Sequence, residues 1–286
     1  MRYQEIKNEV LAAVTADESK YLQDCFDKIN TSYSTNFVPV FSTLNRNLSV
    51  ATRAKTITFK DDDLIINDWE ITQVIRVLFV YAINEDNPDI YYAFVDRLFV
   101  YSSIEELSAL YASLNILKFP EKWQARCAEG IRNNIENVQK AVMLDNKYPA
   151  NYLDQAAWNQ LVLKSFFTQK NVLHIYGLFD RNNQHLAESI VDYIYERHSA
   201  KRNIHPILWL LAKNSLPERA LNILCESMET TTDRIVQSIL FHVMLVNNDK
   251  LKLSINLESL SNKLEIMPFS EEVLDAYKNG KLCVQI

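Results

Sequence analysis

The chain has 286 residues and a mass of 33.3 kDa, enough to bury a large core in one or two domains. It is 48% hydrophobic and 23% charged, a balance typical of globular proteins and not of disordered or fibrous chains. Its net charge of −6 and its pI of about 5.5 argue against nucleic acid or an anionic membrane surface as a nonspecific partner.

Glycine is unusually scarce. The chain has only 3 glycines and 7 prolines, whereas average composition would supply roughly twenty glycines. Sheets and dinucleotide-binding folds need glycine at their turns, while helices joined by short polar loops do not. We therefore predict an all-α protein of stacked antiparallel helical hairpins, similar to an α/α superhelix. Because no clean sequence period is visible, any solenoid of this kind is a degenerate one.

The sequence also bears on cellular location. The N-terminal stretch MRYQEIKNEVLAAV is a polar amphipathic helix and not a secretory signal. No apolar run approaches the ~20 residues of a membrane span. The four cysteines, Cys25, Cys127, Cys225 and Cys283, show no CxxC pairing. We therefore expect free thiols in a reducing cytoplasm, and at most a peripheral association with membrane.

The N-terminal region begins with two predicted helices, at residues 2–14 and 17–33. Residues 34–67 then contain no convincing helix, and we expect an irregular loop there. Within it, residues 56–59 alternate like a short strand and residues 61–63 form an acidic turn. Long irregular segments in compact domains are either solvated loops or functional flaps over pockets. Both interpretations stay open for this one.

Helical periodicity dominates the rest of the chain. Ser103 begins a capping-box pattern with Glu106 three positions later. The short connections between periodic stretches predict that consecutive helices pack as antiparallel neighbours. The predicted helices cover residues 68–84, 88–101, 103–117, 120–144, 149–169, 183–201, 206–213, 216–228, 231–247 and 270–279.

The predicted helix 149–169 combines apolar and polar features. Residues 156–167 carry apolar side chains on nearly every side, which is typical of a buried helix. The same stretch contains Asn159, Gln160 and Lys164. Because a buried amide or ammonium is costly without a hydrogen-bond or charge partner, these residues indicate a polar site. They do not indicate what that site binds.

The predicted helix 120–144 shows a similar anomaly. Asn134 projects from its apolar arc, and Gly130 lies at the edge of that arc, where a glycine permits close approach of another group. Asn134 is either a satisfied core amide that bridges two helices or a ligand contact. We predict that Asn134 and Asn159 are both largely buried and hydrogen-bonded, in adjacent antiparallel helices. On the opposite face, the spacing of Glu129 and Arg132 is typical of a solvated ion-pair ladder.

Helix geometry suggests a partner for Lys164. The turn at residues 145–149 joins the two helices, which places Asp145 and Asn146 near the turn. At about 1.5 Å per residue, Lys164 lies some 22 Å from the turn, level with Glu129 on the preceding helix. We therefore predict Glu129 and Lys164 within ion-pair or one-water distance. They would line the main polar cavity together with Arg132 or Gln160.

Catalytic signatures are absent from the sequence. It contains no GxSxG, no Walker loop, no GxGxxG, no HExxH and no metal-like cluster of cysteine and histidine. The five histidines are not spaced as ligands of one metal ion. We therefore predict no catalytic residues, no metal and no cofactor.

Between Arg126 and Trp209 the sequence resembles the EboA family, bacterial proteins encoded in gene clusters associated with moving secondary metabolites. The most specific element is DQAAWNQLVLK, at residues 154–164. The N-terminal half matches more loosely, and the C-terminal stretch lies outside the resemblance. The other matching stretches are residues 129–132 with Asn134, 144–146, 148–150, 177–178, 180–181, 186–187, 192–193, 196–197 and 206–209.

The resemblance implies a cytoplasmic helical protein without an established catalytic activity. It implies service in metabolite processing or export, beside membrane prenyltransferase-like and sugar-phosphate-type proteins of the same cluster. Residues 1–213 would form the EboA-like domain and 214–286 a helical extension on the same scaffold. The resemblance also joins the polar residues into one ligand site, made of Glu129, Arg132, Asn134, Asn146, Asn159, Gln160 and Lys164.

Three functions are therefore open. The first is an accessory protein that binds a small polar or anionic metabolite, with other proteins of the gene cluster as further partners. The second is a small-molecule enzyme that uses Glu129, Asp145 and Lys164 as acid and base. The third is a protein–protein scaffold. A deep pocket that contains Lys164 would favour the first two, and a dry, fully paired network would favour the scaffold.

Overall fold

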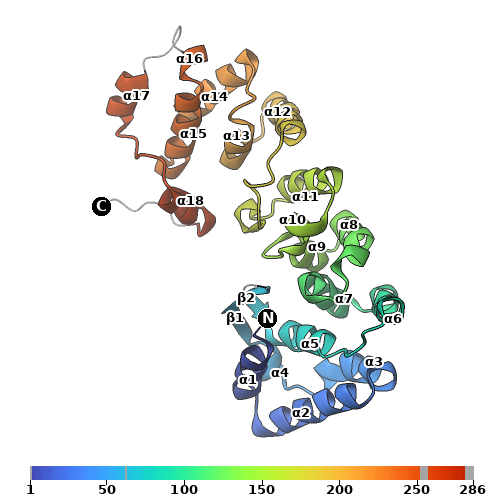
Figure 1. Ribbon diagram of the computed structural model, residues 1–286. Coiled ribbons are helices and arrows are strands. Elements are labelled where there is room, and N and C mark those ends of the chain that lie inside the picture. The colour runs from blue at the N-terminus through green and yellow to red at the C-terminus, as the bar shows by residue number, and fades with distance from the viewer. Residues whose placement is uncertain (1, 62, 252–256, 281–286) are drawn as a thin grey trace. The chain divides into compact units, whose positions relative to one another are not determined.

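The structure of the chain is a computed structural model that describes residues 2–61, 63–251 and 257–280 (Figure 1). The chain divides into two compact units, Met1–Gly177 and Leu178–Ile286. Helices make up most of the described residues, and the sheet found among them is one two-stranded hairpin. The predicted all-α class is confirmed. Whether the helices form a degenerate solenoid stays a prediction, as does the division into residues 1–213 and 214–286.

The N-terminal region is more helical than the sequence predicts. The expected irregular loop at 34–67 begins with a helix, α3, that contains Pro39 in its interior. Its buried face, Phe37, Val40 and Phe41, packs on α2, and this tertiary contact outweighs the weak helix propensity of the segment. The elements are α1 (Tyr3–Ala13), α2 (Ala16–Thr31), α3 (Tyr33–Thr43), η1 (Leu44–Arg46) and α4 (Val50–Arg53).

An antiparallel hairpin follows, and it confirms the strand predicted at residues 56–59. Its strands, β1 (Thr56–Lys60) and β2 (Ile65–Glu70), pack against α5 (Ile71–Tyr81). The predicted helix 68–84 therefore begins only at Ile71. The register shifts between Ile57, which lies opposite Trp69, and Phe59, which lies opposite Ile66. Residues 67 and 68 thus bulge out of the pairing.

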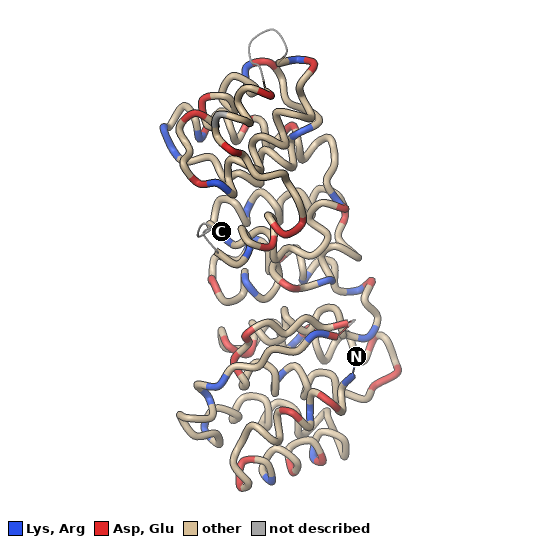
Figure 2. Tube along the Cα trace, turned by 90° about the vertical axis from the view of Figure 1, so that its left-hand side faces the viewer, with Lys and Arg blue, Asp and Glu red and all other residues tan. Residues whose placement is uncertain are grey.

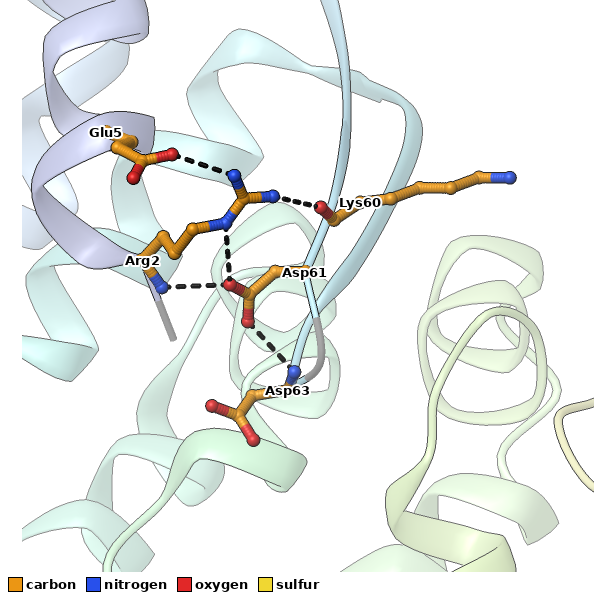
Figure 3. Close-up of polar contacts among 5 residues, drawn as sticks. All are labelled: Arg2, Glu5, Lys60, Asp61 and Asp63. Atoms are coloured by element: carbon orange, nitrogen blue, oxygen red, sulfur yellow. Dashed lines mark hydrogen bonds and ion pairs between the residues drawn. The ribbon is translucent and has the colours of Figure 1, made fainter.

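The tip of the hairpin is fastened to the N-terminus of α1 (Figure 3). The backbone N–H of Arg2 donates to Asp61 Oδ2 at 2.9 Å, and its guanidinium donates to the carbonyl of Lys60 at 2.7 Å. The N–H of Asp63 donates to Asp61 Oδ1 at 2.9 Å. Burial would raise the pKa of Asp61, but these hydrogen bonds from backbone amides outweigh burial and lower it. Both ends of the hairpin are therefore anchored, at its tip by Arg2 and at its base by α5.

The next helices of the first unit contain the predicted capping box. Ser103 Oγ accepts from the N–H of Glu106, whose carboxylate accepts from the N–H of Ser103 at 2.7 Å. Gly130, at the edge of the arc named above, faces the ring of Tyr111, so the close approach that it permits is to a side chain of α7. The elements are α6 (Pro88–Tyr101), α7 (Ile104–Ala112), η2 (Leu114–Ile116) and η3 (Pro120–Trp123).

Both long helices predicted at 120–144 and 149–169 are broken. The first gives α8 (Gln124–Arg132) and α9 (Glu136–Met143). Their break follows from Asn133, whose Oδ1 accepts from the N–H of Ile135 at 2.7 Å and so competes with the helix. The second gives α10 (Tyr148–Tyr152) and α11 (Gln155–Phe167), because Asp154 caps a new helix by accepting from the N–H of Ala157. η4 (Val172–His174) follows.

The second unit is a helical assembly in which α12 packs on α13 and α14, and α15 packs on α13, α14 and α18. The predicted helices between 183 and 247 are confirmed, as is the helix at 270–279. The short helices α16 and α17 are additions that the sequence did not predict. The elements are α12 (Gln184–Ser199), α13 (Pro206–Ala212), α14 (Glu218–Thr230), α15 (Arg234–Val246), α16 (Asn248–Leu251), α17 (Leu257–Leu264) and α18 (Glu271–Lys278).

The three cysteines that the structure describes are free thiols. Cys25 and Cys127 are buried free thiols, Cys225 is a half-buried free thiol, and Cys283 lies outside the described residues. Burial raises the pKa of Cys25 and of Cys127.

Acidic and basic residues are interspersed along both units (Figure 2). Within the described part of the chain, none of the helices has the length and apolarity needed to cross a membrane.

Candidate functional site

The ammonium group of Lys164 lies at the break between α8 and α9. Lys164 projects from α11 and is half-buried. Its Nζ donates to the carbonyl of Asn133 at 2.9 Å and to Asn134 Oδ1 at 3.3 Å. The same carbonyl accepts from Gln139 Nε2 at 2.9 Å. The break in the helix therefore supplies the oxygens that hold this lysine in place.

A second cation stands beside it. Arg132, the last residue of α8, is exposed. Burial, and then the charge of Arg132, lower the pKa of Lys164. Across residues 2–61, 63–251 and 257–280, no carboxylate lies within ion-pair distance of either side chain. Within the described residues, neither cation thus has an ion-pair partner, and we call Arg132, Asn134 and Lys164 the cation cluster.

The predicted ion pair between Glu129 and Lys164 does not form. Glu129 Oε2 instead accepts from Arg126 Nη1 at 2.7 Å, one turn earlier on α8. Arg126 also pairs with Asp96 on α6 at 2.6 Å. The ion-pair form of the prediction is wrong because it assumed one continuous helix over 120–144, and the one-water form stays a prediction. The end of α8 presents Arg132 and Asn133, and not Glu129, to the lysine.

The two asparagines predicted to be buried are also placed differently. Asn134 is exposed, because it lies in the break and not on an apolar helix face. Asn159 is only half-buried on α11, and Gln160, one turn before Lys164, is exposed. The prediction that both amides are largely buried in adjacent helices is therefore wrong. Gln160 and Asn159 share the helix of Lys164.

Asn146 has a structural position instead. It is 6% exposed, and its Nδ2 donates to the carbonyls of Tyr111 and Ala141, both at 3.0 Å. Its Oδ1 accepts from the N–H of Tyr148 at 3.0 Å. These bonds hold the turn that follows α9. This turn follows the C-terminus of α9, whereas the cation cluster lies at its N-terminus. The two are therefore separated by the length of α9, about 12 Å at about 1.5 Å per residue.

A second polar group lies at this turn, and we call it the histidine cluster: Asn67, Asp145 and His174. His174 Nδ1 lies 2.9 Å from Asp145 Oδ2 and 3.1 Å from Oδ1. Asn67 Nδ2 donates to Asp145 Oδ2 at 3.2 Å and also lies 3.5 Å from His174 Nδ1. The backbone N–H of Asp145 also donates to the carbonyl of His174 at 2.8 Å. The carboxylate and the imidazole are therefore held in one orientation relative to each other.

Only Asp145 of this cluster was singled out from the sequence. The three residues come from the hairpin, from the turn after α9 and from η4, so no short motif connects them. His174 carries no metal-like spacing to other histidines. Among the described residues, no group of three His, Cys, Asp or Glu side chains is arranged to hold a metal ion.

Comparison with protein families gives a match over most of the chain. The sequence model of a family described as "Metabolite traffic protein EboA" matches residues 3–213. No curated protein and no solved structure matches the chain. The matched range runs from α1 to α13 and therefore includes both the cation cluster and the histidine cluster.

Proposed function

The chain belongs to the EboA family of metabolite traffic proteins, and from this premise we propose that it is an accessory protein that binds a small anionic metabolite. The observation that supports the proposal is the cation cluster. Arg132 and Lys164 stand together with no carboxylate partner among the described residues. A bound anion would supply the missing counter-charge.

The chemistry of the cluster suits a carboxylate or a phosphate. The guanidinium of Arg132 can bind two oxygens of such a group at once, and Lys164 adds a point charge already oriented by Asn133 and Asn134. The N-terminus of α9 lies directly beyond, and its N-cap residue, Ile135, provides no side-chain cap. Unpaired N–H groups at a helix start favour anions. The two cations and the helix start favour an anion, whereas Glu136, in the first turn of α9 and paired with Lys140, acts against them.

The wider role of the protein follows the family. We place it in secondary-metabolite processing or export, in the cytoplasm, together with other proteins of the same gene cluster. The enzyme that uses Glu129, Asp145 and Lys164 as one acid–base set gains no support from the contacts. Glu129 pairs with Arg126, Lys164 belongs to the cation cluster, and Asp145 belongs to the histidine cluster. No specific observation favours a pure scaffold.

The proposal is tested with Lys164→Met, which keeps the length of the side chain and removes its charge. Small molecules that co-purify with the native protein are identified by mass spectrometry, and binding of inorganic phosphate is measured by calorimetry. Because a charge-assisted hydrogen bond contributes about 1.5–3 kcal/mol, phosphate should bind at least about tenfold more weakly to the variant. Arg132→Gln should weaken binding in the same way.

Lys140→Met is the matched control. Lys140 is also exposed on this part of the chain, but it is paired with Glu136 at 2.9 Å. Replacing Lys140 should change neither the anion that co-purifies with the protein nor the affinity for phosphate. Equal phosphate affinity in Lys164→Met, Arg132→Gln and Lys140→Met would refute anion binding at the cation cluster. Circular dichroism confirms that each variant stays helical.

A further inference from the structure

His174 differs from the other histidines in the surroundings of its two ring nitrogens. Nδ1 lies within hydrogen-bond distance of a carboxylate, that of Asp145. Nε2 has no hydrogen-bond partner among the described residues, and it is not fully buried. The side chains of His174 and Asp145 are 19% and 17% exposed. Among the described residues, Nε2 thus keeps some exposure and has no hydrogen-bond partner, while Nδ1 contacts Asp145.

The other histidines lack this combination. His198 uses Nε2 to contact Glu226 at 3.0 Å. His205 accepts from the N–H of Ile207 with Nδ1 and lies 3.4 Å from the hydroxyl of Tyr277 with Nε2. His242 has its Nε2 buried. His185 is a highly exposed side chain whose Nδ1 is 3.6 Å from Glu188, beyond hydrogen-bond distance.

The backbone is unusual at the two residues that orient the His174 ring, Asp145 and Asn67. Asp145 has φ +50°, in the left-handed region that few residues other than glycine adopt. Asn67 lies in the bulge of the hairpin, next to Asp68 with φ +55°. Bulges redirect side chains and are common beside active sites, and strained residues persist where the surrounding structure holds them. Here both features converge on the carboxylate that contacts His174 Nδ1.

From this geometry we propose that the histidine cluster is a proton-transfer site, in which His174 Nε2 accepts a proton from an O–H or N–H group of a small ligand. Asp145 and Asn67 are positioning residues in this scheme. The inference is independent of anion binding at the cation cluster, which lies at the other end of α9.

The proton can be followed through the step. A neutral His174 that donates from Nδ1 to Asp145 has its lone pair on Nε2. The ligand's proton moves to Nε2, the bonding electrons stay on the ligand's oxygen or nitrogen, and the imidazole becomes an imidazolium. Asp145 remains ionised and stabilises that positive charge across the 2.9 Å contact. Asn67 donates to the same oxygen and keeps the carboxylate turned toward the ring.

Two measurements on the full chain test the proposal. Nitrogen-15 NMR of the wild-type protein should show the neutral His174 ring protonated at Nδ1 and bare at Nε2. Diethyl pyrocarbonate then serves as a chemical probe, because bare Nε2 attacks one of its carbonyl carbons and displaces ethyl carbonate. Mass spectrometry measures the rate at each histidine. Asp145→Asn should slow the modification of His174 about tenfold, since a hydrogen bond to a charged group is lost.

His185 is the internal reference, because Asp145→Asn should not change its rate. Asparagine tolerates a positive φ, so this variant keeps the turn. Asn67→Ala is a second variant, which removes the hairpin's donor but leaves Asp145 beside the ring. In Asn67→Ala the neutral His174 ring should stay protonated at Nδ1. Its modification should slow less than in Asp145→Asn. A ring protonated at Nε2 in the wild type, or equal His174 rates in the wild type and Asp145→Asn, overturns the proposal.

Discussion

Replacing Glu18 with Gln should lower the free energy of unfolding by about 2–3 kcal/mol at neutral pH. Glu18 is 7% exposed on α2. Its Oε1 accepts from the N–H of Ser49 at 2.7 Å. Its Oε2 accepts from the N–H of Thr15 at 2.9 Å and from the hydroxyl of Thr52 at 2.7 Å. The carboxylate thus caps α2 and ties it to α4, and a neutral amide cannot accept all these hydrogen bonds.

The stability that Glu18→Gln loses should depend on pH in a defined direction. Burial would raise the pKa of Glu18, but the hydrogen bonds from Ser49, Thr15 and Thr52 outweigh it and lower the pKa to about 2. The carboxyl binds its proton more weakly in the folded state than in the unfolded state. Its contribution is therefore complete above the ordinary pKa of 4.5 and is lost as the pH falls from there toward 2. Urea unfolding at several pH values measures this.

Glu106→Gln is the matched control. Glu106 occupies the same capping-box position on α7 and is equally buried, but among the described residues its carboxylate accepts a hydrogen bond only from the N–H of Ser103. We expect its replacement to cost about 1 kcal/mol, the usual value for a cap. If Glu18→Gln and the wild type lose stability in parallel between neutral pH and pH 3, the proposed role of the Glu18 carboxylate is wrong.

Gly130→Ala should destabilise the first unit by about 2 kcal/mol through overpacking. A Cβ at this position would lie 2.8 Å from Tyr111 Cδ1 and 2.9 Å from Cζ, and closer still to Cε1. The ring of Tyr111 is buried and packs edge-on against Phe99 at 5.0 Å, so it has little room to move. The clash should exceed the gain of about 1 kcal/mol that alanine brings to a helix.

The same residue pair provides the control. In a Tyr111→Leu background the added methyl group has space, so the cost of Gly130→Ala should shrink or reverse, and the double-mutant cycle isolates the contact. Ala125→Gly, at an exposed position on the same helix, measures helix propensity alone and should cost about 1 kcal/mol. Equal stability of Gly130→Ala and the wild type in chemical denaturation would show that α7 and α8 are not packed as described.

Local sequence was sufficient to predict features that depend on neighbouring residues. Glycine scarcity and 3.6-residue periodicity predicted the helical class and most helices, because amphipathic spacing needs nothing beyond one segment. The capping box at Ser103 and the strand at residues 56–59 were predicted for the same reason. The family resemblance rested on short stretches between Arg126 and Trp209, of which DQAAWNQLVLK is the most specific, and the family match confirms it.

Tertiary structure decided which polar groups meet. Residues 120–144 read as one amphipathic helix, but Asn133 breaks it, so Lys164 meets Asn133 and Asn134 while Glu129 turns to Arg126. Helix α3 forms inside a segment with weak propensity because α2 covers its apolar face. His174 gave no signal at all, since its partners are 29 and 107 positions away along the chain. Contacts at such separations depend on how whole elements pack, and periodicity within one element contains no information about that packing.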